Sequence, residues 1–411
     1  MYIYKAGVVG GGTMGAGIAQ VISYGGLPVV LKERSPELVE KALATARAIY
    51  RGRVDKGKMA PQELEAKMAL ITGTTSYDSF NEVDLVIEAV PERMELKRQV
   101  FAELDASCQP TAILASNTSA LSISALGAAT KRPDKVIGFH FFFPAHVMKL
   151  IEVIPGLLTA QETVDDATAF AESLRKLPVR VNECPGFLVN RLLMPYLNEA
   201  VYCLQEGTPM AEIDSAMTGQ GWPMGPFTLV DALGLDVCAE AGKVLLEGYG
   251  ERMQPAALWE ALIAAKRFGR KSSAGFYRYE GSADPKTAGA EDATLQQLLA
   301  KTAPPTKRPA APFAPERLMY PMVNEAVLAL QEGISSAADI DLAVVAGLGY
   351  PLAKGGILHY ADAVGIDAIL TGLEQFNRQL GPRYHPAHRL RRMVAAGTLG
   401  TKTKRGFFDY A

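Results

Sequence analysis

The sequence predicts an α/β domain with a doubly wound sheet and an inserted helical hairpin, followed by two tandem all-α domains. Three observations lead to this fold class. Up to about residue 181, apolar runs of strand length alternate with helical stretches, a pattern that predicts a parallel sheet. A glycine-rich turn follows the first of these runs, Ala6–Val9. The rest of the chain has a helical pattern, and one helical segment occurs in it twice.

The glycine-rich turn leads directly into a stretch with helical spacing of its apolar residues. In such a strand-to-helix turn, one glycine permits the tight bend, a second lets the backbone approach a pyrophosphate, and a third lets the helix pack closely on the strand. The phosphates then lie at the positive N-terminal end of the helix. The arrangement is of the Rossmann type and predicts a dinucleotide cofactor, held at Gly10, Gly12, Thr13 and Gly15.

An acidic residue, Glu33, follows the second expected strand at residues 27–31. It stands 23 residues after Gly10, about where a carboxylate can accept hydrogen bonds from the adenosine ribose hydroxyls. A carboxylate there would repel a 2′-phosphate, so the sequence predicts NAD rather than NADP. Lys32 and Arg34 flank Glu33 and weaken this inference a little.

We expect the first domain to span residues 1–183, with further strands at residues 83–89, 112–115, 136–142 and 150–154. Residues 35–70 are long, charged and helical in pattern, with a turn near Gly57, so they are expected to form the inserted hairpin. Its basic residues, among them Lys56 and Lys67, form either a solvated amphipathic face or a basic arm for an acidic substrate tail.

The helical region repeats itself. Residues 191–201 return as residues 317–327, and residues 271–279 return as residues 402–410. We therefore expect two copies of one helical domain, at residues 184–280 and 315–411. The segment 281–314 is rich in Ala, Pro, Lys and Thr, with one short helix candidate at residues 293–301, and is interpreted as a linker.

Composition excludes several classes of function. A net charge of −2 gives no positive electrostatic field that would attract nucleic acid. The sequence contains no run of eighteen apolar residues, the length that a membrane-spanning helix needs. The first strand is expected to begin almost at the N-terminus, so we expect no signal peptide. The four cysteines lack metal-ligand spacing, so we expect no metal site and a reducing, cytoplasmic location.

His140 is the best candidate for a catalytic group. It stands at the end of the strand expected at residues 136–142, where a strand meets a loop over the expected cofactor. Glu152 lies inside the next apolar run, where an ionised carboxylate is costly without a partner. A His–Glu dyad explains both positions: the imidazole would take the proton of a secondary alcohol while hydride leaves for the nicotinamide, and the carboxylate would hold the tautomer.

Polar side chains follow the strand at residues 112–115. Asn117 and Ser119 could bond the nicotinamide carboxamide or the substrate oxygen, or residues 116–119 could cap a helix at residues 121–126. Asn190 lies at the first turn of the helical region, where it is either a surface residue or a group that reaches over the cleft between domains.

Five motifs in order carry a family resemblance that covers essentially the whole chain. They are the glycine loop, residues 86–92 with Lys97, residues 116–119, residues 138–142 with Pro144, and residues 185–191. This succession resembles the NAD-dependent L-3-hydroxyacyl-CoA dehydrogenases of fatty acid β-oxidation. The resemblance implies that His140 is the catalytic base, that Glu152 is its partner, and that Ser119 and Asn190 orient the 3-hydroxyacyl group.

The resemblance also implies contacts with the cofactor and with coenzyme A. The positions that match the family's NAD site are Met14, Glu33, Ala89, Val90, Glu92, Lys97, Asn117, Ser119 and Phe143. The inserted hairpin matches the arm that contacts coenzyme A, which favours a substrate-binding role for Lys56 and Lys67. Phe143 departs from the family pattern, which usually has Asn there, and cannot hydrogen-bond the nicotinamide side of the site.

The repeat resembles the dehydrogenase part of multifunctional β-oxidation enzymes, and we expect a protein without their hydratase half. This implies association with a separate hydratase or thiolase. It also implies either a homodimer or a monomer whose two helical copies form a pseudo-dimer. The second copy carries Glu316 where the first has Asn190, so we expect it to be a structural partner.

Two alternatives remain open. One is a β-hydroxyacid dehydrogenase for small free acids, which typically relies on a catalytic Lys. The other is a non-catalytic relative, because the family includes a structural lens crystallin.

Overall fold

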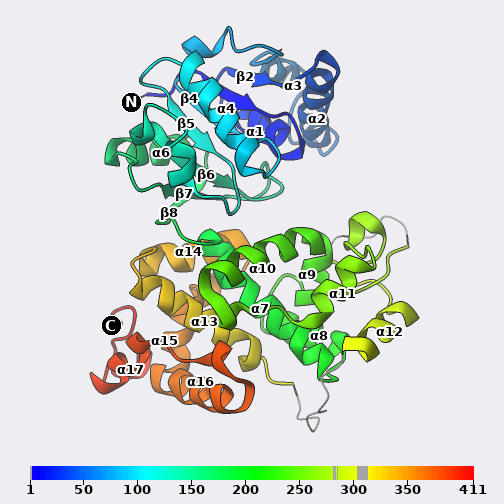
Figure 1. Cartoon of the computed structure of the whole chain (residues 1–411), viewed down its shortest axis with the longest axis vertical. Coiled ribbons are helices and arrows are strands. Elements are labelled where there is room, and N and C mark those ends of the chain that lie inside the picture. The colour runs from blue at the N-terminus through cyan, green and yellow to red at the C-terminus, as the bar shows by residue number, and fades with distance from the viewer. Residues whose placement is uncertain (1, 281–283, 285, 303–312) are drawn as a thin grey trace. The chain divides into compact units, whose positions relative to one another are not determined.

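The computed structural model describes residues 2–280, 284, 286–302 and 313–411, and it divides into two compact units, Met1–Phe187 and Leu188–Ala411. The first unit is an α/β fold built on one sheet, and the second is helical (Figure 1). The predicted fold class is confirmed.

The first unit contains an eight-stranded sheet with the order β3-β2-β1-β4-β5-β6-β7-β8. The strand order reverses between β1 and β4, which makes the carboxyl ends of these strands the expected place for a ligand. The strands are β1 (Ala6–Val9), β2 (Val29–Lys32), β3 (Ile71–Thr74), β4 (Leu85–Glu88), β5 (Ile113–Ser116), β6 (Val136–Phe141), β7 (Leu150–Pro155) and β8 (Leu177–Arg180).

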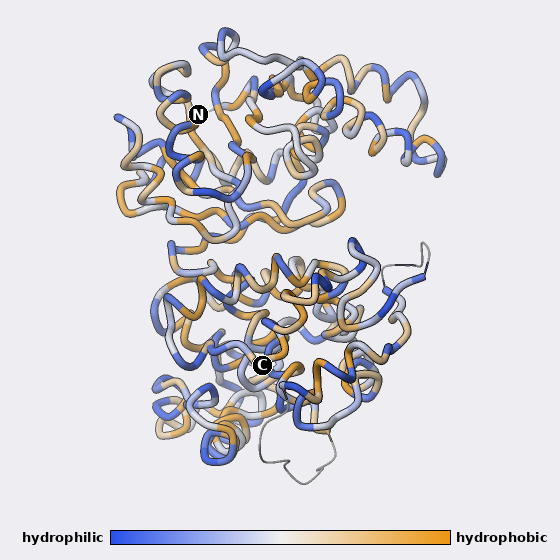
Figure 2. Tube along the Cα trace, turned by 45° about the vertical axis from the view of Figure 1, so that its right-hand side comes forward, coloured by the Kyte–Doolittle hydropathy of each residue, from blue (hydrophilic) through white to orange (hydrophobic). Residues whose placement is uncertain are grey.

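Helices cover this sheet and supply the predicted hairpin, which consists of α2 and α3 (Figure 1). Gly57, with a φ of +66°, lies in the turn between them. The central strands β1, β4, β5 and β6 are mostly apolar and buried, and their polar residues, Glu88, Ser116 and His140, lie toward the carboxyl ends. Figure 2 shows the hydropathy of the chain. The helices of this unit are α1 (Thr13–Tyr24), α2 (Pro36–Val54), α3 (Pro61–Met68), α4 (Met94–Ser107), α5 (Ile123–Gly127) and α6 (Gln161–Ser173).

The sheet differs from the expected parallel sheet at β6 and β7, which pair antiparallel. The reason is the length of the connection: residues 142–149 are too few for the helical crossover that a parallel pair needs. The sequence pattern also missed β3 and β8. Both are edge strands with only one buried residue each, so neither carries a continuous apolar run.

The second unit repeats one series of helices. The first copy runs from α7 to α11 and the second from α13 to α17, with α12 between them. The helices are α7 (Phe187–Gln205), α8 (Met210–Gly219), α9 (Pro226–Leu233), α10 (Leu235–Tyr249), α11 (Ala257–Ala264), α12 (Ala293–Thr302), α13 (Glu316–Gln331), α14 (Ala337–Leu348), α15 (Ile357–Val364), α16 (Ile366–Leu380) and α17 (His388–Ala395).

The two copies pack on each other through reciprocal ion pairs. Arg191 of α7 donates to Glu332 of the second copy at 2.7 Å, and Arg317 of α13 donates to Glu206 of the first copy at 2.7 Å. Arginine and glutamate are separated by the same number of residues in both copies, so the contact is self-complementary, as in a two-fold symmetric dimer. Much of the predicted linker 281–314 lies outside the described residues, apart from α12 and its flanks.

Within the described part of the chain, no helix is long and apolar enough to cross a membrane. The same residues contain no cluster of His, Cys, Asp or Glu that could hold a metal ion, and none of the four cysteines forms a disulfide.

Candidate active site

The glycine turn lies at the carboxyl end of β1, where the strand order reverses. Gly10 has a φ of +96°, and a Cβ there would lie 2.8 Å from the carbonyl oxygen of Ala89. A Cβ at Gly15 would lie 1.7 Å from the carbonyl oxygen of Gly10, because α1 packs directly on the turn. Apart from its two chain neighbours, none of the described residues lies within 4 Å of a Cβ at Gly12, and no side chain caps α1 at that position.

These observations show that the turn fits a dinucleotide. The open space at Gly12 lets a pyrophosphate approach the backbone. The first turn of α1 contains no acidic residue that would repel it, and the N–H groups there, beginning at Thr13 and Met14, have no helical partner.

The Glu33 carboxylate lies beside the glycine turn, just after β2. Its Oε1 accepts the N–H of Gly11 at 2.7 Å, and its Oε2 accepts the N–H of Arg34 at 2.9 Å. Each carboxylate oxygen can accept a further hydrogen bond, so these contacts leave capacity for ribose hydroxyls. Gly11 was not among the predicted cofactor residues, but a Cβ there would lie 2.5 Å from Cβ of Ala42 in α2.

Sequence reasoning also missed Glu88, the last residue of β4. Its carboxylate is completely buried and accepts three hydrogen bonds of 2.7 Å, from the Lys97 ammonium, the Val90 N–H and the Ser116 hydroxyl. These contacts fix the turn at Ala89 and Val90 and tie β4 to the end of β5. The signal was present in the sequence, because Glu88 stands inside an apolar run as Glu152 does.

Lys97, predicted to line the cofactor site, is itself only 1% exposed. Besides Glu88, its ammonium lies 3.2 Å from the carbonyl oxygen of Val90 and 3.3 Å from Oε2 of Glu92. The cation therefore lies beneath the turn and holds Glu92 in place.

Glu92 in turn fixes the segment that follows β5. Its Oε1 accepts the Thr118 hydroxyl at 2.6 Å and the N–H of Ser119 at 2.9 Å, and the Ser119 hydroxyl lies 3.2 Å away. Burial raises the pKa of Glu92, but the Lys97 charge and these hydrogen bonds outweigh burial and hold the pKa below its usual value. Glu92 is thus an ionised acceptor that orients Ser119.

The interpretation of residues 116–119 as a helix cap is wrong. The Thr118 hydroxyl accepts the N–H groups of Ala120 and Leu121 and so forms a separate turn, and α5 begins later with Ser122 as its N-cap. Asn117 contacts the next strand: its Oδ1 accepts the N–H of Phe141 at 2.8 Å. This bond uses the carbonyl oxygen and leaves the Asn117 amide group as a donor.

His140 and Glu152 are brought together by the antiparallel pair β6 and β7, in which they lie directly opposite each other. Nδ1 of His140 lies 2.7 Å from Oε2 of Glu152. His140 is 7% exposed and Glu152 is completely buried. Because a carboxylate accepts, Nδ1 carries the proton, and Nε2 is left as the basic nitrogen.

Phe143 and Val147 lie in the loop between β6 and β7, where they are 60% and 61% exposed. The buried ammonium of Lys176 holds this loop by donating to the carbonyl oxygens of Ala145 at 2.5 Å and Met148 at 2.6 Å. Burial lowers the pKa of Lys176 to about 8. Lys176 was not predicted, because a lysine at a strand start gives no pattern.

The two lysines of the hairpin lie in different surroundings. Burial lowers the pKa of His146, and the charges of Lys176, Arg53 and Lys56 lower it further, so Lys56 lies within electrostatic reach of the loop after β6. Lys67 instead lies over the ring of Tyr24, 5.9 Å from its centroid.

Asn190 belongs to α7 in the second unit. It follows Phe187 by three residues, and the Phe187 ring centroid lies 6.1 Å from that of His140.

Comparison with known protein families matches both units. Residues 5–184 match the family described as 3-hydroxyacyl-CoA dehydrogenase, NAD binding domain. Residues 186–279 and 313–410 match the family described as 3-hydroxyacyl-CoA dehydrogenase, C-terminal domain. The two segments of the second match coincide with the two copies of the repeat.

Curated relatives include the fatty acid oxidation complex subunit alpha of Psychrobacter arcticus, 38% identical over 96% of this chain and 55% of the relative. The corresponding subunit of Pseudomonas putida is 37% identical over 96% of this chain and 56% of the relative. The chain therefore spans about half the length of these relatives.

Among solved structures, the 3-hydroxybutyryl-CoA dehydrogenase of Escherichia coli is 31% identical with a TM-score of 0.85, over 96% of this chain and 99% of that one. The (S)-3-hydroxybutyryl-CoA dehydrogenase of Ralstonia eutropha is 40% identical with a TM-score of 0.66, over 68% of this chain and 100% of that one.

Proposed function

Because this chain belongs to the NAD-dependent 3-hydroxyacyl-CoA dehydrogenase family, we propose that it interconverts an L-3-hydroxyacyl-CoA and the 3-oxoacyl-CoA, with His140 as general base and Glu152 as its partner. The observation that carries the proposal is the buried His140–Glu152 contact of 2.7 Å. This contact favours the tautomer of His140 that carries its proton on Nδ1, so that Nε2 can act as the base.

The proposed steps follow from the two ring nitrogens. Glu152 accepts the Nδ1 proton, which leaves Nε2 to take the hydroxyl proton of the substrate. As the O–H bond breaks, its electron pair forms the second bond of the carbonyl, and the hydrogen on the same carbon leaves as hydride with the electron pair of its C–H bond. NAD, when bound, supplies the acceptor for that hydride. The resulting imidazolium is stabilised by the ionised carboxylate of Glu152.

Ser119 and Asn190 are proposed to orient the 3-hydroxyacyl group. The support for Ser119 is its fixed position on Glu92 at the carboxyl end of the sheet. The support for Asn190 is its place in the chain, three residues after the ring that lies beside His140. We propose that Asn117 donates to the nicotinamide carboxamide through its remaining amide group.

We propose that Lys56 contacts the phosphates of coenzyme A, since its charge acts on the loop after β6. The support for Lys67 is weaker, because it packs on Tyr24.

We further propose the domain division 1–183, 184–280, 281–314 and 315–411, with the second helical copy as a structural partner. The chain would act in the cytoplasm as a pseudo-dimeric monomer or a homodimer, beside a separate hydratase or thiolase. The support for such partners is that the relatives are subunits of a fatty acid oxidation complex.

The assay that tests this proposal follows NADH absorbance with acetoacetyl-CoA and, in parallel, with free acetoacetate. We expect oxidation of NADH with the thioester and at least 100-fold slower oxidation with the free acid. Equal rates would favour a dehydrogenase for free acids, and no turnover of either compound would favour a non-catalytic member.

A further inference from the structure

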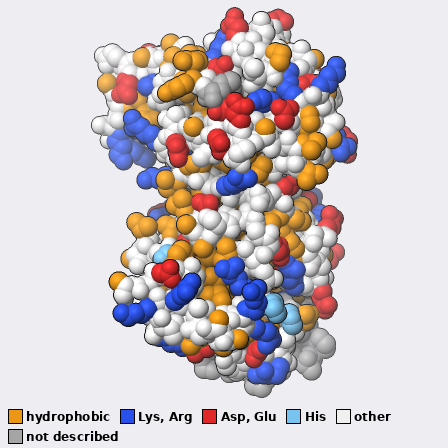
Figure 3. Space-filling view, turned by 90° about the vertical axis from the view of Figure 1, so that its left-hand side faces the viewer, with side chains coloured by type: hydrophobic (Ala, Val, Ile, Leu, Met, Phe, Trp, Pro, Cys, Tyr) orange, Lys and Arg blue, Asp and Glu red, His pale blue; other side chains and the backbone are white. Residues whose placement is uncertain are grey.

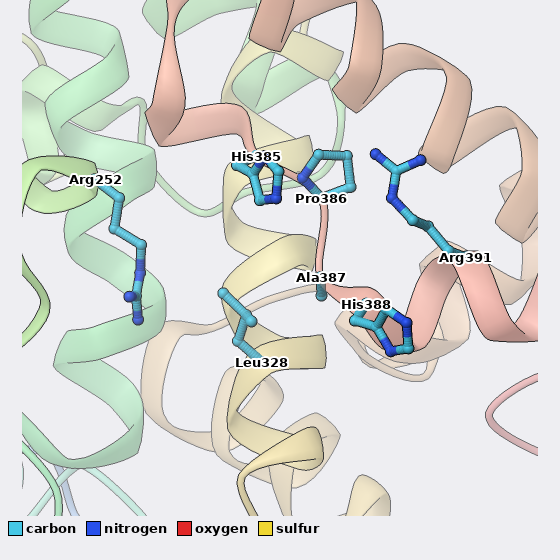
Figure 4. A pocket seen from close by; sticks show the side chains of 7 residues that line it. All are labelled: Arg252, Leu328, His385, Pro386, Ala387, His388 and Arg391. Atoms are coloured by element: carbon cyan, nitrogen blue, oxygen red, sulfur yellow. The ribbon is translucent and has the colours of Figure 1, made fainter.

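A cavity of about 310 Å³ lies in the C-terminal unit, between the two helical copies (Figure 4). Lys, Arg and His side chains gather on one face of this unit (Figure 3). The first copy contributes Arg252 to the cavity, and the second contributes Leu328 of α13, the segment 385–387, and His388 and Arg391 of α17.

The matching place in the first copy is occupied by a tyrosine. Leu328 matches Tyr202, because α13 repeats α7 at a fixed offset. The Tyr202 hydroxyl donates to the carbonyl oxygen of Gln254 at 3.1 Å, and the Arg383 guanidinium lies over its ring, 4.5 Å from the centroid. Leu328 has neither ring nor hydroxyl, and it lines the cavity together with Arg252, the counterpart of Arg383.

The lining of the cavity is also more basic than its counterpart. Three lining residues are basic where the first copy has a neutral or acidic residue: His385 for Gln254, His388 for Ala257 and Arg391 for Glu260. α17 has no acidic residue in its first turn, whereas Glu260 stands in the first turn of α11. Positive side chains at a helix N-terminus oppose the helix dipole, so this change is unfavourable unless an anion is nearby.

Two carboxylates hold the arginines in place without using all of their donors. Nε of Arg252 donates to Glu325 at 2.8 Å, and the guanidinium lies over the ring of Tyr249, 4.5 Å from its centroid. Arg391 pairs with Glu374 of α16. A guanidinium has five N–H donors, so these carboxylates leave donors of both lining arginines for an oxyanion in the cavity.

We propose that this cavity is a second ligand site, which binds a phosphate-bearing anion. A guanidinium fork, two imidazoles and a helix N-terminus are the groups that proteins use for phosphate. Leu328 and Pro386 add an apolar wall for an organic carrier. The volume is at the lower end of the range of ligand pockets, roughly 300–1,000 Å³, and suits a phosphate with part of its carrier.

The histidines give a local readout, because the chain contains only five. The imidazole signals in a ¹H–¹³C spectrum of the full chain, saturated with NAD, are followed during titration with inorganic phosphate and, separately, with adenosine 3′,5′-bisphosphate. The pH and ionic strength are held constant, and sodium chloride is the reference. His385→Gln and His388→Ala assign the two signals and restore the first-copy residues.

We expect the His385 and His388 signals to shift saturably with phosphate and not with chloride. Tighter binding of the bisphosphate would identify an organic phosphate as the ligand, and equal binding would identify free phosphate. Leu328→Tyr, which reinstates the tyrosine of the first copy, should weaken binding at least tenfold, whereas Lys243→Ala on α10 should not change it. Equal shifts with chloride, or unchanged binding in a folded Leu328→Tyr variant, would overturn the proposal.

Discussion

Glu152 lies directly opposite His140 in the antiparallel pair of β6 and β7, with Oε2 of the carboxylate 2.7 Å from Nδ1 of the imidazole. Glu152→Gln keeps the shape of the side chain but can donate to Nδ1, which would put the proton on Nε2. We expect kcat for acetoacetyl-CoA reduction or the reverse reaction to fall by roughly 10²–10⁴-fold, the usual contribution of general acid–base catalysis.

The control is Glu162→Gln. Glu162 lies on α6, its side chain is 72% exposed, and its Oε2 lies 3.7 Å from the Lys135 ammonium. Its kcat should equal that of the parent. If Glu152→Gln were as active as this control, Glu152 would not determine the tautomer of His140.

Phe143 exposes 60% of its surface in the loop after the catalytic strand. Phe143→Asn would add a hydrogen-bonding group on the nicotinamide side of the site. We expect NAD affinity to rise by roughly 2- to 10-fold, as one hydrogen bond contributes about 0.5–1.5 kcal/mol. NADH fluorescence titration measures it.

Val147→Asn is the matched variant, because Val147 is 61% exposed in the same loop. Its NAD affinity should not change. Identical affinity and turnover in the parent and in Phe143→Asn would show that position 143 does not contact the cofactor.

The sequence predicted the dyad because both members depart from their surroundings: a histidine ends one apolar run and a glutamate interrupts the next. The sequence also predicted the glycine turn, because the positive φ of Gly10 and the close packing at Gly15 require residues without a side chain. Glu88 has the same signal as Glu152, and only the absence of a nearby histidine in the sequence hid it. Its partners, Lys97 and Ser116, come from other elements and meet it only when the sheet forms.

The antiparallel β6–β7 pair and the edge strands could not be read from apolar runs. Strand direction depends on the length of the connection, and edge strands bury too few residues to show a pattern.

Lys97 and Glu88 form an ion pair in which the side chains are only 1% and 0% exposed. Lys97→Met would leave the Glu88 charge buried without its partner. We expect this variant to lose roughly 3–5 kcal/mol of unfolding free energy, measured by urea denaturation. Lys97→Met combined with Glu88→Gln should recover part of that loss.

Lys5→Met is the control, because Lys5 and Glu82 form an ion pair whose side chains are 27% and 68% exposed. Exposed pairs contribute at most about 1 kcal/mol. A Lys97→Met variant as stable as Lys5→Met would mean that the buried pair is dispensable for folding.

Arg191 and Arg317 occupy matched positions in the reciprocal contact between the helical copies. Replacing either by Ala removes one arginine from two glutamates of the other copy, which are Glu325 and Glu332 for Arg191 and Glu199 and Glu206 for Arg317. Glu325 and Glu199 each keep a second arginine, Arg252 and Arg383. We expect each variant to lose roughly 3–5 kcal/mol of unfolding free energy. The loss should be larger for Arg191, whose side chain is 0% exposed, than for Arg317, at 17%.

Arg405→Ala serves as the reference, since the Arg405 side chain is 71% exposed. Its stability should stay within about 0.5 kcal/mol of the parent. If only one of the two variants, Arg191→Ala or Arg317→Ala, were destabilised, the two matched contacts would not contribute equally to stability.

Lys176 gives the chain a stability that depends on pH. Burial lowers its folded-state pKa to about 8, whereas an unfolded lysine keeps a pKa of about 10.4. Between these values the unfolded state binds one more proton than the folded state, so this group makes unfolding less favourable as the pH rises. Compared with Lys176→Met, the parent should therefore gain up to about 1.4 kcal/mol of unfolding free energy per pH unit in this window.

Urea denaturation of the parent and of Lys176→Met at pH 7, 8.5 and 9.5 measures that difference, because the other titrating groups cancel. Lys149→Met, which removes an exposed lysine next to the same loop, is the control for the loss of a lysine from this surface. If the difference between the parent and Lys176→Met were the same at all three pH values, the Lys176 ammonium would titrate as it does in the unfolded chain. Its two carbonyl contacts would then have to be the hydrogen bonds of a fully charged group.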